Sequence, residues 1–328
     1  MSERNILLVE DEQKTANILK KGLEENGYYV EIAYDGLIGQ RLFMTHSYDL
    51  VILDINLPVI NGIDLCRFIR NTNGQIPIIM LTAMNAIDDN SYHKSWQDIG
   101  KKLPRPKAIL SISAHWTTTG TRVTVASHPE TIHDFGGFPK KLFDQQYPAP
   151  GSPEMAQLTK EIVTYSHIQG DDKWGLDHGT WSVLLPMYPA ADIPVYQLSL
   201  DYDKPPQYHY EIGKQLSKLR EKGVLVLGSG NLVHNLRMVD WNGGNKVYDW
   251  AREFDSKFTD WMEKGDHKSI LDYQKILGNT ATMAHPSYEH LLPLFYVLGL
   301  QHKSEKVTFF NSQFDMASIS MRSLLINS

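Results

Sequence analysis

The sequence predicts an α/β protein with doubly wound, mostly parallel sheets. In residues 1–83, short apolar runs rich in β-branched residues alternate with helical periods at the spacing of parallel βαβ units. The run 108–114, Ala-Ile-Leu-Ser-Ile-Ser-Ala, reads as a buried strand that stops at a polar imidazole, His115. The segments 195–200, 207–222 and 224–227 then continue the alternation of strand and helix.

Length and composition are those of a globular protein of the cytoplasm. The 328 residues are enough for two domains, and the net charge of −6, with scattered basic residues, predicts no nucleic-acid partner. The single cysteine, Cys66, excludes an internal disulfide and fits a reducing compartment. No apolar run approaches the roughly 18 residues of a membrane span, so no membrane association is expected.

The first quarter of the chain carries its elements in a regular order. Strands are expected at 5–9, 28–33, 49–53 and 76–81. A helix is expected after each of the first three strands. The first helix closes at the C-cap signal Asn26-Gly27, the second covers 36–44 and the third ends near Arg70.

Three carboxylates lie at the carboxyl ends of neighbouring strands in this region. Glu10 and Asp11 follow the first strand and Asp54 follows the third. Brought together, they would repel unless a hard cation such as Mg²⁺ lay among them. The alternative is that they are ordinary solvated loop acids.

The surrounding phrases resemble the receiver domain of two-component response regulators. They are Ile-Leu-Leu-Val-Glu-Asp-Glu, Asp-Leu-Val-Ile-Leu-Asp-Ile-Asn-Leu-Pro and Ile-Pro-Ile-Ile-Met-Leu-Thr-Ala, within residues 4–83. The resemblance implies a flavodoxin-like domain with Asp54 as phosphoacceptor and a histidine kinase as partner. It further implies that Glu10, Asp11 and Asp54 bind Mg²⁺ and that Thr82 is the switch hydroxyl.

This receiver is incomplete. The family continues through a fourth helix and a fifth strand that ends in Lys-Pro, whose lysine pairs with the phosphoryl group. Here Lys107 begins an apolar run instead of ending one. We therefore predict a truncated receiver domain over residues 1–83 and a second domain over residues 84–328.

Four histidines of the second domain stand beside strand ends or in Gly/Pro-rich turns: His115, His178, His234 and His290. His234 follows a Gly-Ser-Gly-Asn turn, where small residues allow close approach of a ligand. Trp174 and Trp181 flank His178, and aromatic walls suit a flat ring substrate. Imidazole is a common ligand of iron and zinc. The alternative is that these are unrelated surface or core imidazoles.

The phrases around these histidines resemble the class III extradiol dioxygenases, in particular the bacterial DOPA 4,5-dioxygenase-like branch. They are Ser-Ala-His-Trp, Thr-Ile-His-Asp-Phe-Gly-Gly-Phe-Pro, Tyr-Pro-Ala-Pro-Gly-Ser-Pro, Asp-His-Gly-Thr-Trp, Gly-Asn-Leu-Val-His-Asn-Leu and Pro-x-x-Glu-His. The resemblance implies O₂-dependent cleavage of a catechol beside its two hydroxyls, with Fe(II) or Zn(II) as cofactor. By position, His115 and His290 would be metal ligands. His234 would be the acid/base or a further ligand, and His178 would line the substrate pocket.

One element of that family is missing. Its first strand ends in a Gly-His-Gly-Ser-Pro-Met-Asn phrase whose histidine binds the metal. Only Met84-Asn85 of this phrase is present, and an ungapped alignment puts Met80 in place of the histidine. Neither Met80 nor Thr82 is a good substitute ligand for Fe(II) or Zn(II).

The strand at 76–82 is thus claimed by both halves of the chain. We expect one extended sheet, or two sheets that share this strand, with the helix 91–102 and the strand 108–114 in place of the missing receiver elements. Three functions remain open. They are an extradiol catechol dioxygenase impaired by loss of one ligand, a response-regulator module phosphorylated at Asp54, and an inactive chimera.

Overall fold

The structure is a computed structural model that describes residues 4–54, 57–81, 91–135, 140–240 and 246–327. The chain divides into two compact units, and each is described by itself. The first contains the chain up to β4 together with α5 (Lys140–Phe143), and the second contains the remaining elements, from α4 onward. Among the described residues, no helix has both the length and the apolar character needed to cross a membrane.

The first unit is built on a four-stranded parallel sheet in the order β2-β1-β3-β4. Its helices connect successive strands, as the sequence predicts for βαβ units. The strands are β1 (Arg4–Val9), β2 (Tyr28–Ala33), β3 (Leu50–Asp54) and β4 (Ile78–Leu81). The helices are α1 (Gln13–Glu24), α2 (Gly36–Thr45) and α3 (Gly62–Thr72).

Alternate residues of β1 bury themselves on opposite faces of this sheet. Ile6 and Leu8 pack with α1 residues such as Ala16, whereas Leu7 and Val9 join the cluster that includes residues of α2 and α3. A strand covered on both faces reads as a continuous apolar run. This explains why the first unit could be predicted from its sequence pattern.

The strands of the second unit form parallel pairs, and near the C-terminus they form two antiparallel pairs, β12–β15 and β13–β14. The strands are β5 (Ala108–Ser113), β6 (Thr117–Thr118), β7 (Arg122–Thr124), β8 (Gln169–Asp171), β9 (Val195–Gln197), β10 (Leu200–Asp201), β11 (Val224–Ser229), β12 (Lys306–Phe310), β13 (Phe314–Asp315), β14 (Ile319–Ser320) and β15 (Ser323–Asn327). The helices are α4 (Ser91–Lys102), α6 (Pro153–Ile162), α7 (His178–Met187), α8 (Pro206–Arg220), α9 (Asp249–Lys264), α10 (His267–Leu271), α11 (Tyr273–Leu277), α12 (Asn279–Ala284) and α13 (Leu292–Gly299), with a 3₁₀ turn at Leu236–Met238.

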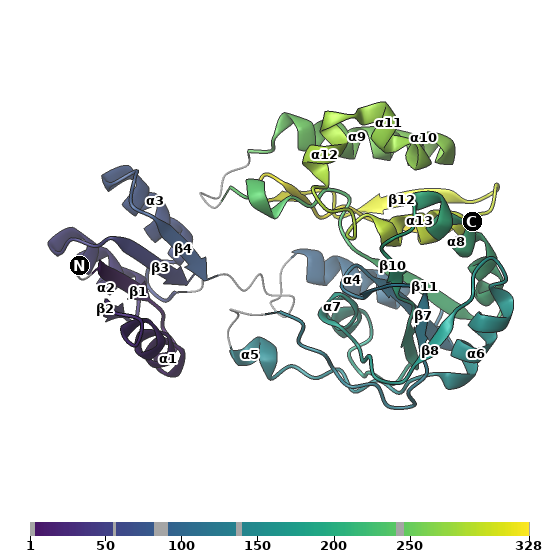
Figure 1. The fold of residues 1–328 in the computed structure, drawn as a ribbon, viewed down its shortest axis with the longest axis horizontal. Coiled ribbons are helices and arrows are strands. Elements are labelled where there is room, and N and C mark those ends of the chain that lie inside the picture. Colours follow the sequence, from purple (N-terminus) through teal and green to yellow (C-terminus); the bar gives the residue numbers. More distant parts are fainter. Residues whose placement is uncertain (1–3, 55–56, 82–90, 136–139, 241–245, 328) are drawn as a thin grey trace. The chain divides into compact units, whose positions relative to one another are not determined.

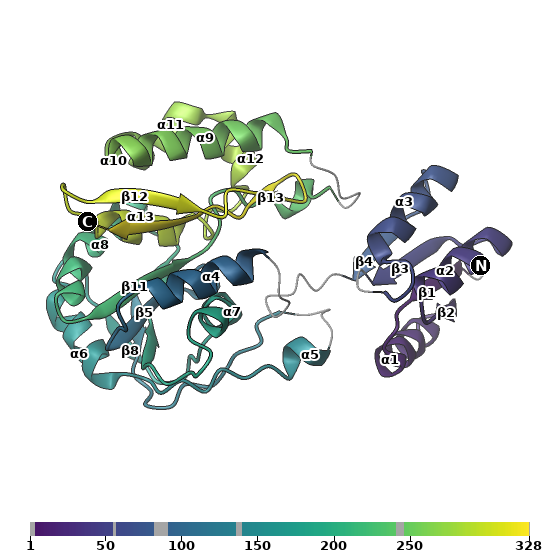
Figure 2. The same ribbon diagram turned by 180° about the vertical axis from the view of Figure 1, so that it is seen from behind.

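Its central sheet is parallel, in the order β11-β5-β9, and β5 is buried along its whole length. On one face, Leu110 and Ile112 join a core that includes residues of α8 and α13. On the other face, Ser111 Oγ lies 2.8 Å from Thr180 Oγ1 of α7. Helices therefore cover both faces, with α8 beside α13 and α4 beside α7 (Figures 1 and 2).

The prediction of a shared strand is wrong. Along the described chain, β4 pairs with β3, and β5 carries β11 on one edge and β9 on the other. Both edges of β5 are therefore occupied, so β4 does not pair with β5. The helix α4 packs against α7 and so belongs to the second unit, where it replaces nothing in the receiver sheet.

Candidate metal centre

Two of the four predicted histidines lie at the end of a strand and at the start of a helix. His115 follows β5, and its backbone N–H donates to Ser113 Oγ at 3.2 Å. His178 is the first residue of α7, whose N-cap Asp177 accepts the N–H of Thr180 at 3.1 Å. The next residue is Gly179, where an added Cβ would lie 2.8 Å from His115 Cδ2. The missing side chain thus lets the first turn of α7 lie against His115.

The loop after β11 holds His290. Asn231 donates its backbone N–H to the carbonyl oxygen of His290 at 3.0 Å, and its side-chain Oδ1 lies 3.0 Å from His290 Nδ1. The Nδ2 of Asn231 donates to Ser320 O at 3.1 Å, which orients the amide with its oxygen toward the imidazole. His290 Nδ1 therefore carries the proton in that contact, and its Nε2 keeps a free lone pair.

The four imidazoles converge. The ring centroids of His115 and His178 are 3.9 Å apart, those of His115 and His290 are 5.2 Å apart, and those of His234 and His290 are 3.6 Å apart. These residues come from four separate segments of the chain. The structure thus brings together the histidines that the sequence analysis singled out.

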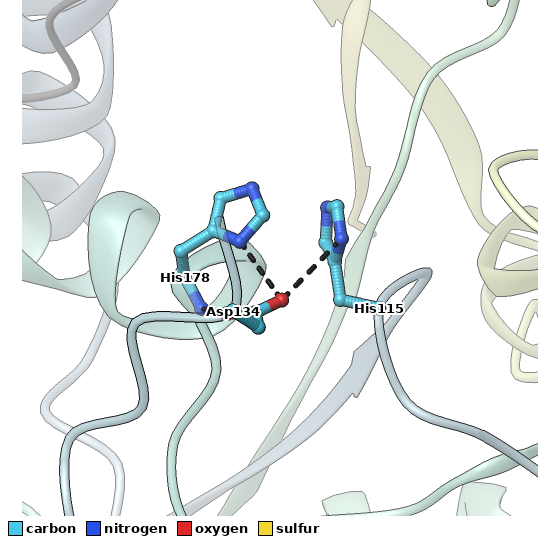
Figure 3. Close-up of side chains that lie close together, drawn as sticks. All are labelled: His115, Asp134 and His178. Atoms are coloured by element: carbon cyan, nitrogen blue, oxygen red, sulfur yellow. Dashed lines mark hydrogen bonds and ion pairs between the residues drawn. The ribbon is translucent and has the colours of Figure 1, made fainter. Parts of the chain in front are cut away.

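Asp134 is a member of this cluster that the sequence analysis did not single out. One of its carboxylate oxygens, Oδ2, lies 2.9 Å from His178 Nδ1 and 3.5 Å from His115 Nδ1. The other, Oδ1, accepts the backbone N–H of His178 at 2.8 Å. Figure 3 shows the carboxylate between the two rings.

Burial keeps three of the imidazoles neutral. It lowers the pKa of His115, with the neighbouring His178 acting in the same direction. Burial also lowers the pKa of His234 to about 4 and that of His290 well below its ordinary value. A neutral imidazole offers a nitrogen lone pair at neutral pH, as metal binding requires.

The ring orientations test whether these residues fit a transition metal. His115 and His290 are nearly perpendicular, at 88°, and two imidazoles bound about 2 Å from one ion have centroids about 5 Å apart. The rings of His234 and His290 are parallel within 8°. Lone pairs in the planes of two stacked rings do not meet at one ion. Glu289 also offers a carboxylate oxygen within 4.8 Å of both His234 and His290. Imidazole and carboxylate donors of this kind fit a transition metal, and they form two neighbouring groups, His115 with Asp134 and His178, and His290 with His234 and Glu289.

Comparison with known proteins agrees with this geometry. The pattern of the family described as the catalytic LigB subunit of aromatic ring-opening dioxygenase matches residues 77–323. The 4,5-DOPA dioxygenase extradiol of Escherichia coli K12 is 43% identical over 269 residues, which cover 80% of this chain and 98% of that protein. The chain belongs to the LigB dioxygenase family.

Other LigB relatives extend the likeness. The 4,5-DOPA dioxygenase extradiol of Beta vulgaris is 38% identical over 247 residues, covering 71% of this chain and 89% of that protein. The crystal structure of protein JW3007 from Escherichia coli K12 superposes with a TM-score of 0.63 at 39% identity, covering 74% of this chain and 94% of that one. The predicted α/β dioxygenase fold is confirmed.

The N-terminal unit is a response regulator receiver domain. The pattern of that domain matches residues 6–94. The transcriptional regulatory protein CusR of Escherichia coli K12 is 51% identical over 83 residues, which are 25% of this chain and 37% of that protein. The LigB and receiver patterns overlap over residues 77–94. The predicted boundary between residues 83 and 84 lies in this overlap and outside the described residues.

The receiver unit brings Glu10, Asp11 and Asp54 together, with one carboxylate oxygen of each within 4.8 Å of the others. Asp54 is 3% exposed at the end of β3. Glu10 accepts the backbone N–H of Glu12 at 3.1 Å. Burial raises the pKa of Glu10 to about 7, helped by the charge of Asp54 and opposed by the hydrogen bond from Glu12. A hard cation fits three such carboxylates.

Some predicted features lie elsewhere. Thr82 and Met84-Asn85 lie outside the described residues, and so does the side chain of Met80. Trp181 is not a pocket wall, because its side chain is fully buried and its Nε1 donates to Ile132 O at 2.9 Å. Trp174 stacks on Trp116 with centroids 5.6 Å apart.

Proposed function

We propose that this LigB-family chain is an extradiol dioxygenase that cleaves a catechol such as DOPA with O₂. The convergence of His115, His178, His234 and His290 is the observation that carries the proposal. Two relatives named 4,5-DOPA dioxygenase extradiol support the choice of substrate. Both oxygen atoms of O₂ enter the product as the ring opens beside its two hydroxyl-bearing carbons.

His115 and His290 are the proposed metal ligands. Their near-perpendicular rings and lowered pKa values support this role, and Asn231 keeps the Nε2 of His290 free to bind. In this site Fe(II), or Zn(II) in the protein as isolated, would bring the catecholate and O₂ together and let electron density pass from ring to oxygen. Loss of the family's first histidine leaves a coordination position to water, so we expect weaker metal binding and slower turnover.

His234 is the proposed acid/base for the catechol proton. Its stacking on His290 supports this role over that of a ligand in the same plane, and its pKa of about 4 makes it a neutral proton acceptor at pH 7. His178 stands on the first turn of α7, with its ring centroid 3.9 Å from that of His115, and is proposed to contact the substrate.

The test is metal analysis of the purified chain followed by an assay with DOPA and simpler catechols. After loading with Fe(II) under reducing conditions, O₂ consumption and a yellow ring-opened product are expected. If the loaded protein consumes no O₂ with any catechol, it is the inactive chimera, and the proposal fails.

A second candidate function rests on the cluster of Glu10, Asp11 and Asp54. In this alternative a histidine kinase phosphorylates Asp54 in the presence of Mg²⁺, and the receiver, predicted to end at residue 83, controls the attached domain. Labelling by acetyl phosphate that disappears in Asp54→Ala would support it. Absence of labelling would fit the missing receiver lysine. The cytoplasm remains the proposed location, supported by the single, buried cysteine Cys66.

A further inference from the structure

One carboxylate faces two imidazoles that do different work in the proposed function. Asp134 Oδ2 lies 2.9 Å from His178 Nδ1 and 3.5 Å from His115 Nδ1. Its side chain is 17% exposed, against 26% for His115 and 30% for His178, so all three are partly withdrawn from water. In Figure 3 the second nitrogen of each ring points away from Asp134.

We propose that Asp134 is a shared positioning residue that fixes the tautomer of both His115 and His178. The inference rests on the proposed function, in which His115 binds the metal and His178 contacts the substrate. An ionised carboxylate only accepts hydrogen bonds, so in this proposal each Nδ1 that faces it carries the ring proton. Both Nε2 atoms then keep their lone pairs. The one on His115 is available to a metal ion, and the one on His178 can accept a hydrogen bond from the substrate.

The backbone around Asp134 makes this arrangement specific. Because Asp134 Oδ1 holds the backbone N–H of His178, the carboxylate is anchored to the first turn of α7 before either ring contacts it. The absence of a Cβ at Gly179 keeps that turn against His115. Metal-binding histidines commonly donate their other ring N–H to a carboxylate or a carbonyl. Here Asn231 Oδ1 lies 3.0 Å from Nδ1 of His290, and Asp134 Oδ2 lies 3.5 Å from Nδ1 of His115.

The substitution Asp134→Asn separates this role from a purely structural one. Asparagine is isosteric, and its Oδ1 can still accept the N–H of His178. Its amide nitrogen, however, is a donor and would face the two Nδ1 atoms. Each ring would then favour the tautomer with the proton on Nε2, which removes the lone pair from the metal side. Loss of an outer partner of this kind typically weakens metal binding by about 10–100-fold.

The experiment uses the full chain and Zn²⁺ as the probe. Zn²⁺ affinity is measured by competition with a chromogenic chelator, and the tautomers of the metal-free protein are read from long-range ¹H–¹⁵N NMR correlations of the imidazoles. In Asp134→Asn we expect about a 10–100-fold weaker affinity and a shift of the His115 and His178 signals to the Nε2–H form. Asp134→Glu, which restores an acceptor-only group, should recover the Nδ1–H form.

The matched control is Asp192→Asn, the same change at an exposed aspartate that pairs with Arg105 at 2.8 Å. It should leave affinity and tautomers unchanged. Wild-type affinity or unchanged tautomers in Asp134→Asn would overturn the proposal. A second equivalent of Zn²⁺ that is lost in Asp134→Asn would also overturn it, because Asp134 would then be a direct ligand. The tautomer measurement needs neither metal nor turnover, so its outcome is separate from failure of the catechol assay.

Discussion

The imidazole rings of His234 and His290 are stacked, with centroids 3.6 Å apart and planes 8° from parallel. Because their lone pairs lie in separate planes, we expect His290 to bind the metal and His234 not to bind it. His234→Gln should therefore keep Zn²⁺ affinity within a few-fold, yet lower the rate of catechol cleavage by about 10²–10⁴-fold, as loss of a general acid/base does. Chelator competition and O₂ uptake measure the two effects.

The matched variant is His290→Gln, which removes the proposed ligand from the same stack. It should lose most of the Zn²⁺ affinity. If His234→Gln and His290→Gln weaken binding equally, the two histidines share the ion and the acid/base role falls to another residue.

Gly179 sets the distance between α7 and His115. An alanine Cβ there would lie 2.4 Å from Ser113 Oγ and 2.8 Å from His115 Cδ2, so the helix start or the imidazole must move. Such overpacking costs about 1–3 kcal/mol. We expect Gly179→Ala to lower the free energy of unfolding by that amount and to weaken Zn²⁺ binding. Urea denaturation and chelator competition check both.

The control is Gly22→Ala in the exposed part of α1, where an added Cβ meets no heavy atom within 4 Å. Here alanine should stabilise the helix by up to about 1 kcal/mol, with Zn²⁺ binding unchanged. Equal effects of the two substitutions would show that the contact with His115 is unimportant.

The sequence predicts which segments form strands and which histidines form the site. It predicts less well which strands pair with one another and which residues contact those histidines. Continuous apolar runs identify β1 and β5, because each is buried on both faces. The pairing of β4 with β3 could not be predicted in this way, because the apolar pattern of a strand does not specify which strand it pairs with. Asp134 was missed for a similar reason. It stands in a loop without periodicity, and only its contacts with His115 and His178 distinguish it from other aspartates.

The carboxylates of the receiver unit should bind a divalent ion. Mn²⁺ can replace Mg²⁺ as a probe, because both prefer oxygen ligands. Asp54→Asn removes a buried charge from the cluster of Glu10, Asp11 and Asp54, so it should weaken Mn²⁺ binding at least tenfold, as measured by electron paramagnetic resonance. The same change at Asp49, whose carboxylate accepts the N–H of Asn5 at 2.8 Å, serves as control. Equal Mn²⁺ affinity in both variants would place the ion elsewhere.

The ion pair between Arg220 and Glu305 makes the stability of the dioxygenase unit depend on acid. Hydrogen bonds from the Arg220 guanidinium lower the pKa of Glu305 from 4.5 to about 2. Because the folded-state pKa is depressed, this contribution is complete above about pH 4.5 and is lost as the pH falls toward about 2. Since the Arg220 side chain is 30% exposed, we expect Glu305→Gln to cost about 1–2 kcal/mol at neutral pH.

The measurement is urea denaturation of wild type and Glu305→Gln from neutral pH to about pH 3.5. The difference in unfolding free energy should be constant above the pKa of an unfolded glutamate, about 4.3, and shrink below it. Glu211 pairs with Lys214 on α8, and its side chain is 27% exposed, against 8% for Glu305. Glu211→Gln should therefore change stability little at any pH. A difference for Glu305→Gln that stays the same down to the lowest pH would mean that the carboxylate's charge contributes nothing, and that the substitution acts through packing alone.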